Sequence, residues 1–259
     1  DIEFPLKVKK VPKAERRARA LGLLRMLRLP ENYYDKNVMK CSGGERQRVA
    51  LARAFAYDPD VLLFDEPLSA LDYKLKKVLE KELKDLHRES GKTFIYITHS
   101  LEEAMVMSDR IAVMRSGQII QVGSPEEIYA HPADEFVAEF FGEVNKFPVS
   151  LVAGRGWYSA GLDRPLRLDL PAELQGATAA TVVVRPEYMQ FAGSEDEFDN
   201  VIRGTVFNEY SLGSRMQYQI RCGDRSVLLE NPRTFTRDRA RDEQVLIGWN
   251  AANAIIAGA

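Results

Sequence analysis

One stretch near the start of the chain, residues 13–29, has apolar side chains at helical spacing and predicts an amphipathic helix that breaks at Pro30. Further helices are expected over 42–57, 73–89 and 100–107. The first and last of these open with Ser-x-x-Glu, which predicts a capping box at each. The apolar positions in the 13–29 stretch include Ala18, Leu21, Leu24 and Leu27.

Short apolar runs alternate with these helices. VLLF at 61–64 and TFIYIT at 93–98 predict strands. Since VLLF has no polar member, we expect a parallel strand buried on both faces. RIAVMR and QIIQVG flank Ser116-Gly117, which predicts a hairpin over 110–123. Residues 124–142 should form two short helices around a proline.

The pattern changes near residue 145. Before it, strands and helices alternate, which indicates an α/β fold with a largely parallel sheet. After it, short apolar runs alternate with Gly, Pro and Asp, which is typical of a small all-β, barrel-like domain. The sequence therefore predicts two domains, 1–145 and 146–259.

Composition narrows the class of protein. The chain has 259 residues, is 45% hydrophobic and 29% charged, and carries a net charge of −2, so no global field favours nucleic acid. Two distant cysteines suggest neither a disulfide framework nor a metal site and fit a reducing compartment. No apolar run approaches the roughly 20 residues of a membrane span. A basic run over 7–19 is a solvated helix face or a contact with a polyanion or partner.

The segment CSGGERQRVALARA, residues 41–54, raises a question about its two glycines. Ser42 and Glu45 form the capping box of the expected helix. Gly43 and Gly44 weaken a helix, and glycine is favoured where another group must approach the backbone closely. Bare amides at a helix N-terminus bind anions, so we expect a phosphate on Ser42–Glu45.

Three further stretches have polar residues after apolar runs. LLFDEP (62–67) ends in Asp65 and Glu66, and in P-loop ATPases such a pair holds Mg²⁺ and orients the attacking water. Taken alone, the stretch is better explained as a strand that ends in a polar loop. Ser69–Asp72 follows, and taken alone it indicates only an N-cap, Asp72, of the helix expected over 73–89. His99, taken alone, indicates only a surface residue after a strand.

The order of these motifs within about sixty residues changes that interpretation. CSGGE resembles the signature motif of ATP-binding-cassette (ABC) transporters, VLLFDEP their Walker B strand, SALD their D-loop, and Ile97-Thr98-His99 their H-loop. The chain is therefore identified as a member of their nucleotide-binding subunits. Cys41 and Glu45 depart mildly from the family pattern, which usually has Leu and often Gln at these positions.

The resemblance implies roles for individual residues. Asp65 would hold Mg²⁺, Glu66 would polarise the hydrolytic water, and His99 would touch the γ-phosphate of ATP. Ser42, Gly43, Gly44 and Glu45 would belong to a site for ATP held by a second copy, with Asp72 at that homodimer interface. The implied partners are membrane permease subunits and, indirectly, a solute-binding protein. The implied location is the cytoplasmic face of the membrane.

The phosphate-cradling sequence G-x-x-x-x-G-K-[ST] does not occur in the chain. Gly91-Lys92-Thr93 contains GKT, but Leu86 stands where the first glycine belongs, and Gly91 is better explained as a helix C-cap. The chain thus resembles a family member that begins after the Walker A motif and Q-loop. The expected fold is an incomplete P-loop core that retains its helical subdomain. We expect these 259 residues alone not to bind ATP tightly, and the sheet to expose apolar surface.

The C-terminal part resembles the TOBE-type (OB-like) domain of importer ATPases. Val184–Glu187, with Gly204, Val206, Tyr210 and Gly213, carries that resemblance. LDYKLKK (71–77) and FFGEVNKF (140–147) are most similar to ATPases of spermidine/putrescine importers. Importers of ferric iron, sugars, thiamine or phosphonates stay open, as does a non-catalytic regulatory fragment. A DNA-repair or chromosome ATPase is disfavoured because residues 1–40 contain no sustained heptads.

Overall fold

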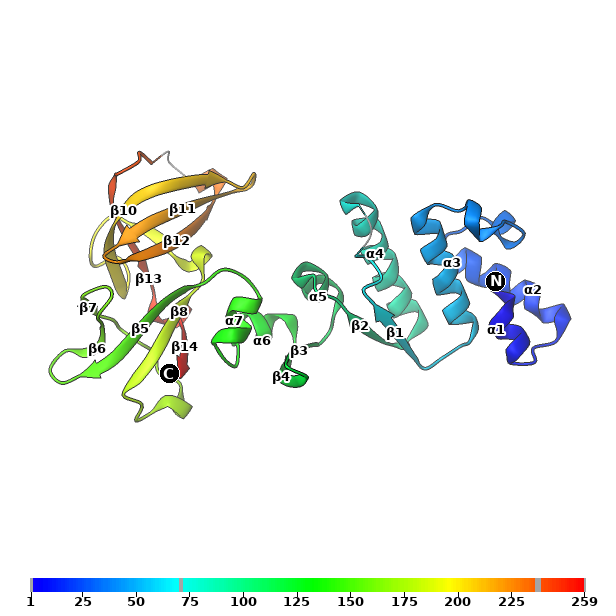
Figure 1. Ribbon diagram of the computed structural model, residues 1–259, viewed down its shortest axis with the longest axis horizontal. Coiled ribbons are helices and arrows are strands. Elements are labelled where there is room, and N and C mark those ends of the chain that lie inside the picture. Colours follow the sequence, from blue (N-terminus) through cyan, green and yellow to red (C-terminus); the bar gives the residue numbers. More distant parts are fainter. Residues whose placement is uncertain (1, 70–71, 236–238, 259) are drawn as a thin grey trace. The chain divides into compact units, whose positions relative to one another are not determined.

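The computed structural model describes residues 2–69, 72–235 and 239–258. These residues form two compact units, Asp1–Ser108 and Asp109–Ala259. The first unit carries most of the helices and one parallel strand pair, and the second is dominated by antiparallel strands (Figure 1). This confirms the predicted combination of an α/β core with a β-rich C-terminal part.

The first unit contains the predicted helices and strands in the predicted order. It comprises α1 (Glu3–Val8), α2 (Lys13–Met26), η1 (Glu31–Tyr34), η2 (Val38–Lys40), α3 (Gly43–Ala56), β1 (Val61–Asp65), α4 (Tyr73–Ser90), β2 (Thr93–Ile97) and α5 (Leu101–Met107). The sequence pattern did not predict α1, η1 and η2. Helix α2 ends three residues earlier than expected. Arg28 has a φ of +52°, and the amide of Leu29 donates to the carbonyl of Leu24 at 2.8 Å, which closes the helix before Pro30.

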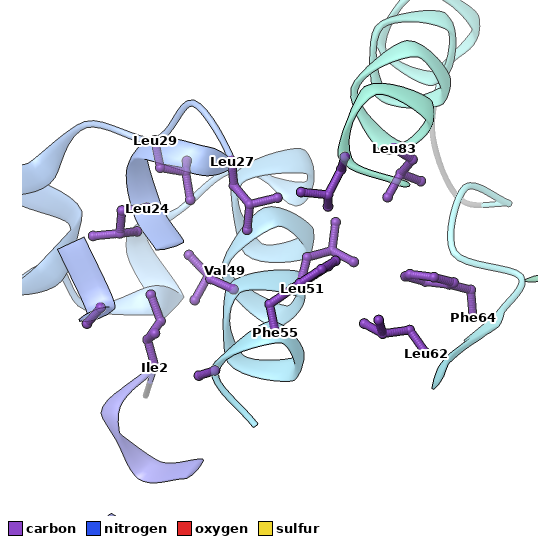
Figure 2. Packing of buried hydrophobic residues seen from close by; sticks show 14 of the residues in the cluster. Ile2, Leu24, Leu27, Leu29, Val49, Leu51, Phe55, Leu62, Phe64 and Leu83 are labelled. Atoms are coloured by element: carbon purple, nitrogen blue, oxygen red, sulfur yellow. The ribbon is translucent and has the colours of Figure 1, made fainter. Parts of the chain in front are cut away.

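The core of this unit lies between its helices and one face of the strand pair. Figure 2 shows Leu62 and Phe64 of β1 beside Phe55 of α3 and Leu83 of α4, all of them buried. Phe94 of β2 contacts the ring of Phe64 at 5.0 Å between centroids. Alternate residues of both strands therefore point into one shared apolar layer.

Strands β1 and β2 pair in parallel, from Val61 opposite Thr93 to Asp65 opposite Ile97. The expectation that VLLF is buried on both faces is wrong. Leu63 is 74% exposed, and Ile95 and Ile97 are also exposed. The helices of the described unit cover only the face of the strand pair to which Leu62 and Phe64 point. The exposed apolar surface that the sequence predicted is this opposite face.

The second unit begins with the predicted hairpin and helix pair. Strands β3 (Ile111–Arg115) and β4 (Gln118–Gly123) are antiparallel, and Ser116 and Gly117 both adopt positive φ, as a two-residue hairpin turn requires. Helices α6 (Pro125–Ala130) and α7 (Glu135–Phe140) follow, and each begins after a side-chain N-cap, Ser124 and Asp134 respectively.

The β-rich part contains two five-stranded sheets within the described residues. One has the order β12-β11-β10-β13-β9 and the other β14-β8-β5-β6-β7. Phe147 and Trp249 stack at 5.1 Å between the ring centroids, in the apolar core that the strands share. The elements are β5 (Asn145–Val152), β6 (Gly156–Ser159), β7 (Arg164–Pro165), η3 (Ala172–Leu174), β8 (Ala179–Val184), η4 (Pro186–Tyr188), β9 (Gln190–Ala192), β10 (Asn200–Ser211), β11 (Arg215–Cys222), β12 (Arg225–Pro232), η5 (Arg233–Phe235), β13 (Gln244–Trp249), η6 (Ala251–Asn253) and β14 (Ile255–Gly258).

Two residues of the TOBE-like pattern have a visible structural reason. Gly204 lies so close to β11 that an added Cβ would stand 2.4 Å from Ile220, so no larger residue fits. Arg185 is 1% exposed, and its guanidinium donates to the carbonyls of Tyr129 and Ala138. Arg185 thereby attaches α6 and α7 to the strands. The domain boundary after residue 145 stays a prediction.

Candidate active site at the ends of the parallel strands

The candidate catalytic residues lie at the carboxyl ends of β1 and β2. Because Asp65 pairs with Ile97 in the parallel register, the residues that follow both strands emerge at the same edge. The amide of Glu66 donates to the carbonyl of Ile97 at 2.9 Å. His99 then places its Nδ1 3.0 Å from Oε1 of Glu66. The structure thus brings together two residues that are 33 positions apart.

This pair is open to a ligand. The side chain of His99 is 72% exposed and that of Glu66 is 46% exposed. Glu66 has a φ of +44°, a conformation that non-glycine residues adopt rarely and mostly where the surroundings enforce it. Here the amide and the hydroxyl of Ser69 both donate to the Glu66 carbonyl, at 3.3 and 3.0 Å. The turn therefore holds the Glu66 side chain outward beyond the strand.

Asp65, the last residue of β1, is exposed beside this pair. No group of three or more His, Cys, Asp or Glu side chains that could hold a metal occurs in the described parts of the chain. The exposed carboxylate of Asp65 is the kind of ligand that Mg²⁺ uses, since proteins usually bind this ion through one or two carboxylates together with waters and substrate phosphates.

The predicted phosphate site opens α3. The capping box is present: the hydroxyl of Ser42 accepts from the amide of Glu45 at 3.3 Å, and the Glu45 carboxylate accepts from the amide of Ser42 at 2.7 Å. The hydroxyl of Tyr33 also donates to Glu45, and Lys36 lies 3.6 Å from it. Donation from Tyr33 and from the Ser42 amide lowers the pKa of Glu45 to about 2.

The structure shows whether packing explains the glycine at position 43. The residue is exposed, and a Cβ built there meets no heavy atom within 4 Å. No packing contact among the described residues therefore requires glycine at this position. Gly44 is buried in the same turn. Close approach of a group from outside the chain to the Ser42–Glu45 turn would account for this glycine.

Two expectations near α4 and α5 have different outcomes. Asp72 precedes α4, and its carbonyl accepts from the amide of Lys76 at 2.9 Å, as at the start of a helix. Ala70 and Leu71 of the SALD motif lie outside the described residues. The second expectation, a capping box over Ser100–Glu103, is only half correct. The Ser100 hydroxyl caps the Glu103 amide at 3.4 Å, but the Glu103 carboxylate binds other residues instead.

The two parts of the candidate site come from different elements, the start of α3 and the ends of β1 and β2. No hydrogen bond or ion pair among the described residues of the first unit joins the Ser42–Glu45 turn to Glu66 or His99. Sequence reasoning named every member of both groups but did not find Tyr33 and Lys36, which bind Glu45. Only their aromatic and basic character, eight and five positions before Cys41, could have suggested them.

Comparison with known proteins decides the family. The family model described as ABC transporter matches residues 4–69, and the model described as TOBE domain matches residues 182–256. The protein of Mesorhizobium japonicum named "Spermidine/putrescine import ATP-binding protein PotA" is 41% identical over 261 residues, covering 98% of this chain and 71% of that protein. The chain belongs to the ATP-binding proteins of ABC transporters.

A second relative carries the same name. The protein of the same name from Ruegeria pomeroyi is 39% identical, and the match covers 96% of this chain and 68% of that one. Among solved structures, cbiO1 from Clostridium perfringens, part of an ABC transporter complex, is 32% identical with a TM-score of 0.47. That match covers 51% of this chain and 53% of the other.

ABC ATP-binding proteins hydrolyse ATP to drive transport, so the chain is part of an enzyme family that binds nucleotide. In the described part of the chain, no helix is long and apolar enough to cross a membrane. The assignment of Ser42–Glu45 to the signature motif, of Asp65 and Glu66 to Walker B and of His99 to the H-loop stays a prediction. Their detailed roles are proposed below.

Proposed function

We propose that the protein carrying these residues is the ATP-hydrolysing subunit of a binding-protein-dependent importer of polyamines such as spermidine and putrescine. The observation that carries the catalytic part is the 3.0 Å contact between Glu66 and His99 at the shared edge of β1 and β2. The polyamine part is supported by the names of the relatives, which are 41% and 39% identical.

Each site residue has a role that its geometry supports. Glu66, held outward by its turn, polarises the attacking water, and the exposed His99 faces the γ-phosphate. Asp65 holds Mg²⁺ together with waters and phosphate oxygens, and the ion supplies neutralisation of phosphate charge. The remaining members of the proposed site act on a second copy of the subunit.

The signature turn is suited to phosphate held by that second copy. Ser42 and Gly43 are exposed, and no contact within the described chain covers their amides apart from the Ser42–Glu45 capping box. Amides at the first turn of a helix stabilise an anion that approaches along the helix axis. Asp72, exposed before α4, lies at the interface between the two copies. Permease subunits couple this dimer, at the cytoplasmic face of the membrane, to transport. A periplasmic or extracellular solute-binding protein delivers the polyamine to the permease from the opposite side.

Transport into membrane vesicles tests the proposal. The gene product that carries these residues is assembled with its permease and binding protein, and ATP-dependent uptake of labelled spermidine is measured. We expect uptake and ATP hydrolysis in the wild type and loss of both in Glu66→Gln. The matched control is Glu89→Gln, which changes an exposed glutamate of α4 and should leave both activities intact.

The outcomes separate the parts of the proposal. ATP hydrolysis without spermidine or putrescine uptake would overturn the substrate, and competition by ferric iron, sugar, thiamine or phosphonate would then identify the class that replaces it. An assembled complex without any ATP hydrolysis would overturn the catalytic role and favour a regulatory module. Full activity in Glu66→Gln would remove Glu66 from the proposed mechanism.

A further inference from the structure

Glu103 is a buried carboxylate directly behind the H-loop. The residue is 2% exposed and lies in the first turn of α5. Its Oε1 lies 2.5 Å from Nζ of Lys76, and its Oε2 accepts from the hydroxyls of Thr98 and Tyr96 at 2.8 and 3.0 Å. The three partners come from α4 and from the end of β2. Glu103 therefore joins three elements at one point.

The contacts of this carboxylate keep it ionised. Burial disfavours the charged form, but donation from Lys76, Thr98 and Tyr96 outweighs it and lowers the pKa of Glu103 below its usual range. Burial and the adjacent Glu103 charge raise the pKa of Tyr96, so this hydroxyl remains a donor. Removing one member of such a buried cluster leaves the others without partners, which is costly.

The cluster continues to both sides of His99. The Thr98 hydroxyl donates to Glu103 and accepts from the amide of Ser100 at 2.9 Å. Lys76 also donates to the hydroxyl of Ser100, at 3.3 Å. The residues before and after His99 are therefore both held, while the His99 ring itself is 72% exposed. Because the ring has little packing of its own, its place depends on this backbone and on the contact with Glu66.

We propose that Glu103 is a positioning residue that holds the Thr98–Ser100 turn and thereby sets the His99 ring against Glu66. This role explains why Glu103 does not close the capping box that its sequence predicts: its two oxygens are occupied by Lys76, Thr98 and Tyr96. The inference deepens the proposed function, on which the role of His99 toward phosphate rests. The position of the turn does not depend on that function.

Nuclear magnetic resonance of the histidine rings tests the position directly and needs no ATP. The chain has three histidines, His87, His99 and His131, so ring-labelled protein gives few signals, which single His→Gln variants assign. The Glu66–His99 contact is measured as the change in the His99 ring signals caused by Glu66→Gln. We expect a clear change in the wild-type background and loss of that change in the Glu103→Ala background.

Glu102→Ala is the matched control, because Glu102 is the neighbouring glutamate, 58% exposed, and pairs with Lys77 rather than with the Thr98 turn. It should leave the His99 response intact. His87 and His131 signals report whether a variant is folded. If Glu103→Ala does not fold, Thr98→Val removes only the hydroxyl that bridges Glu103 to Ser100 and should abolish the same response. Glu103→Gln retains an acceptor for the two hydroxyls and should rescue part of it.

An unchanged His99 response in folded Glu103→Ala, or in Thr98→Val, would overturn the proposal. A parallel measurement of ATP turnover distinguishes failure of this proposal from failure of the proposed function. In the assembled transporter, Glu103→Ala should lower kcat while leaving KM for ATP nearly unchanged, because it misplaces a group that acts during hydrolysis. A wild type without ATP turnover would remove the proposed function but leave the resonance result standing.

Discussion

Gly43→Ala separates two explanations for the glycine that opens α3. If glycine is needed by the fold, alanine should destabilise the protein. The structure argues against this, since an added Cβ meets no heavy atom within 4 Å and the φ of Gly43 lies outside the left-handed region. Replacing a glycine by alanine at a compatible position stabilises proteins by about 0.4 to 1 kcal/mol, chiefly by restricting the unfolded chain. We therefore expect Gly43→Ala to be more stable than the wild type by that amount.

Urea unfolding followed by far-ultraviolet circular dichroism measures this gain, because the longest helices belong to the first unit. The matched control is Gly22→Ala in α2, where an added Cβ also meets nothing within 4 Å. Both variants should raise the urea midpoint with an unchanged m-value. Only Gly43→Ala should lower ATP hydrolysis in the assembled transporter.

The loss of activity has a physical upper bound. Removing one donor from a site that stabilises developing negative charge lowers kcat roughly 100- to 1000-fold. A Cβ beside the Gly43 amide displaces the phosphate without removing the donor, so the loss should be smaller than this. A Gly43→Ala variant less stable than the wild type would show that the fold itself needs the glycine. Full ATP hydrolysis in that variant would refute the close approach of phosphate.

Three further outcomes follow from the structure. Glu45→Gln should lower the free energy of unfolding at neutral pH. The difference from the wild type should disappear as pH falls from about 4.5 to about 2, because the folded pKa of Glu45 is depressed and the stabilising charge is lost over that range. Urea unfolding at several pH values in this range measures the difference. Leu24→Ala should destabilise the first unit by about 2 to 5 kcal/mol, because Leu24 is fully buried, as urea unfolding would show. Cys222 should resist iodoacetamide at pH 8 until the protein is unfolded, since burial raises the pKa of its thiol to about 12; mass spectrometry detects the label.

A different result would contradict each of these three predictions. A constant difference between Glu45→Gln and the wild type down to the lowest pH would mean that the Tyr33 and Ser42 contacts do not stabilise the charged form. A Leu24→Ala cost well below 1 kcal/mol would indicate that the helices repack around the cavity. Rapid labelling of Cys222 in the folded protein would contradict its burial beneath the strands.

Local patterns in the sequence predicted the elements of this protein well. Capping boxes, proline breaks and apolar periodicity depend on residues within one or two turns of one another, so they can be interpreted without knowing the path of the chain. The same reasoning failed where neighbours distant in sequence decide the result. The run VLLF is exposed on one face because an apolar run does not reveal how many layers cover a strand.

By itself, the sequence determined the fold class, the order of the main helices and strands, and the ABC family, since these follow from local patterns along the chain. Only the tertiary structure showed that Glu66 and His99 meet at 3.0 Å, because that contact depends on the parallel register of β1 and β2. Likewise, Ser-x-x-Glu predicts a local cap at Glu103, yet Lys76, 27 positions earlier, competes for its carboxylate. Side-chain partners of this kind depend on how elements pack in space, and the neighbouring residues along the chain do not specify that packing.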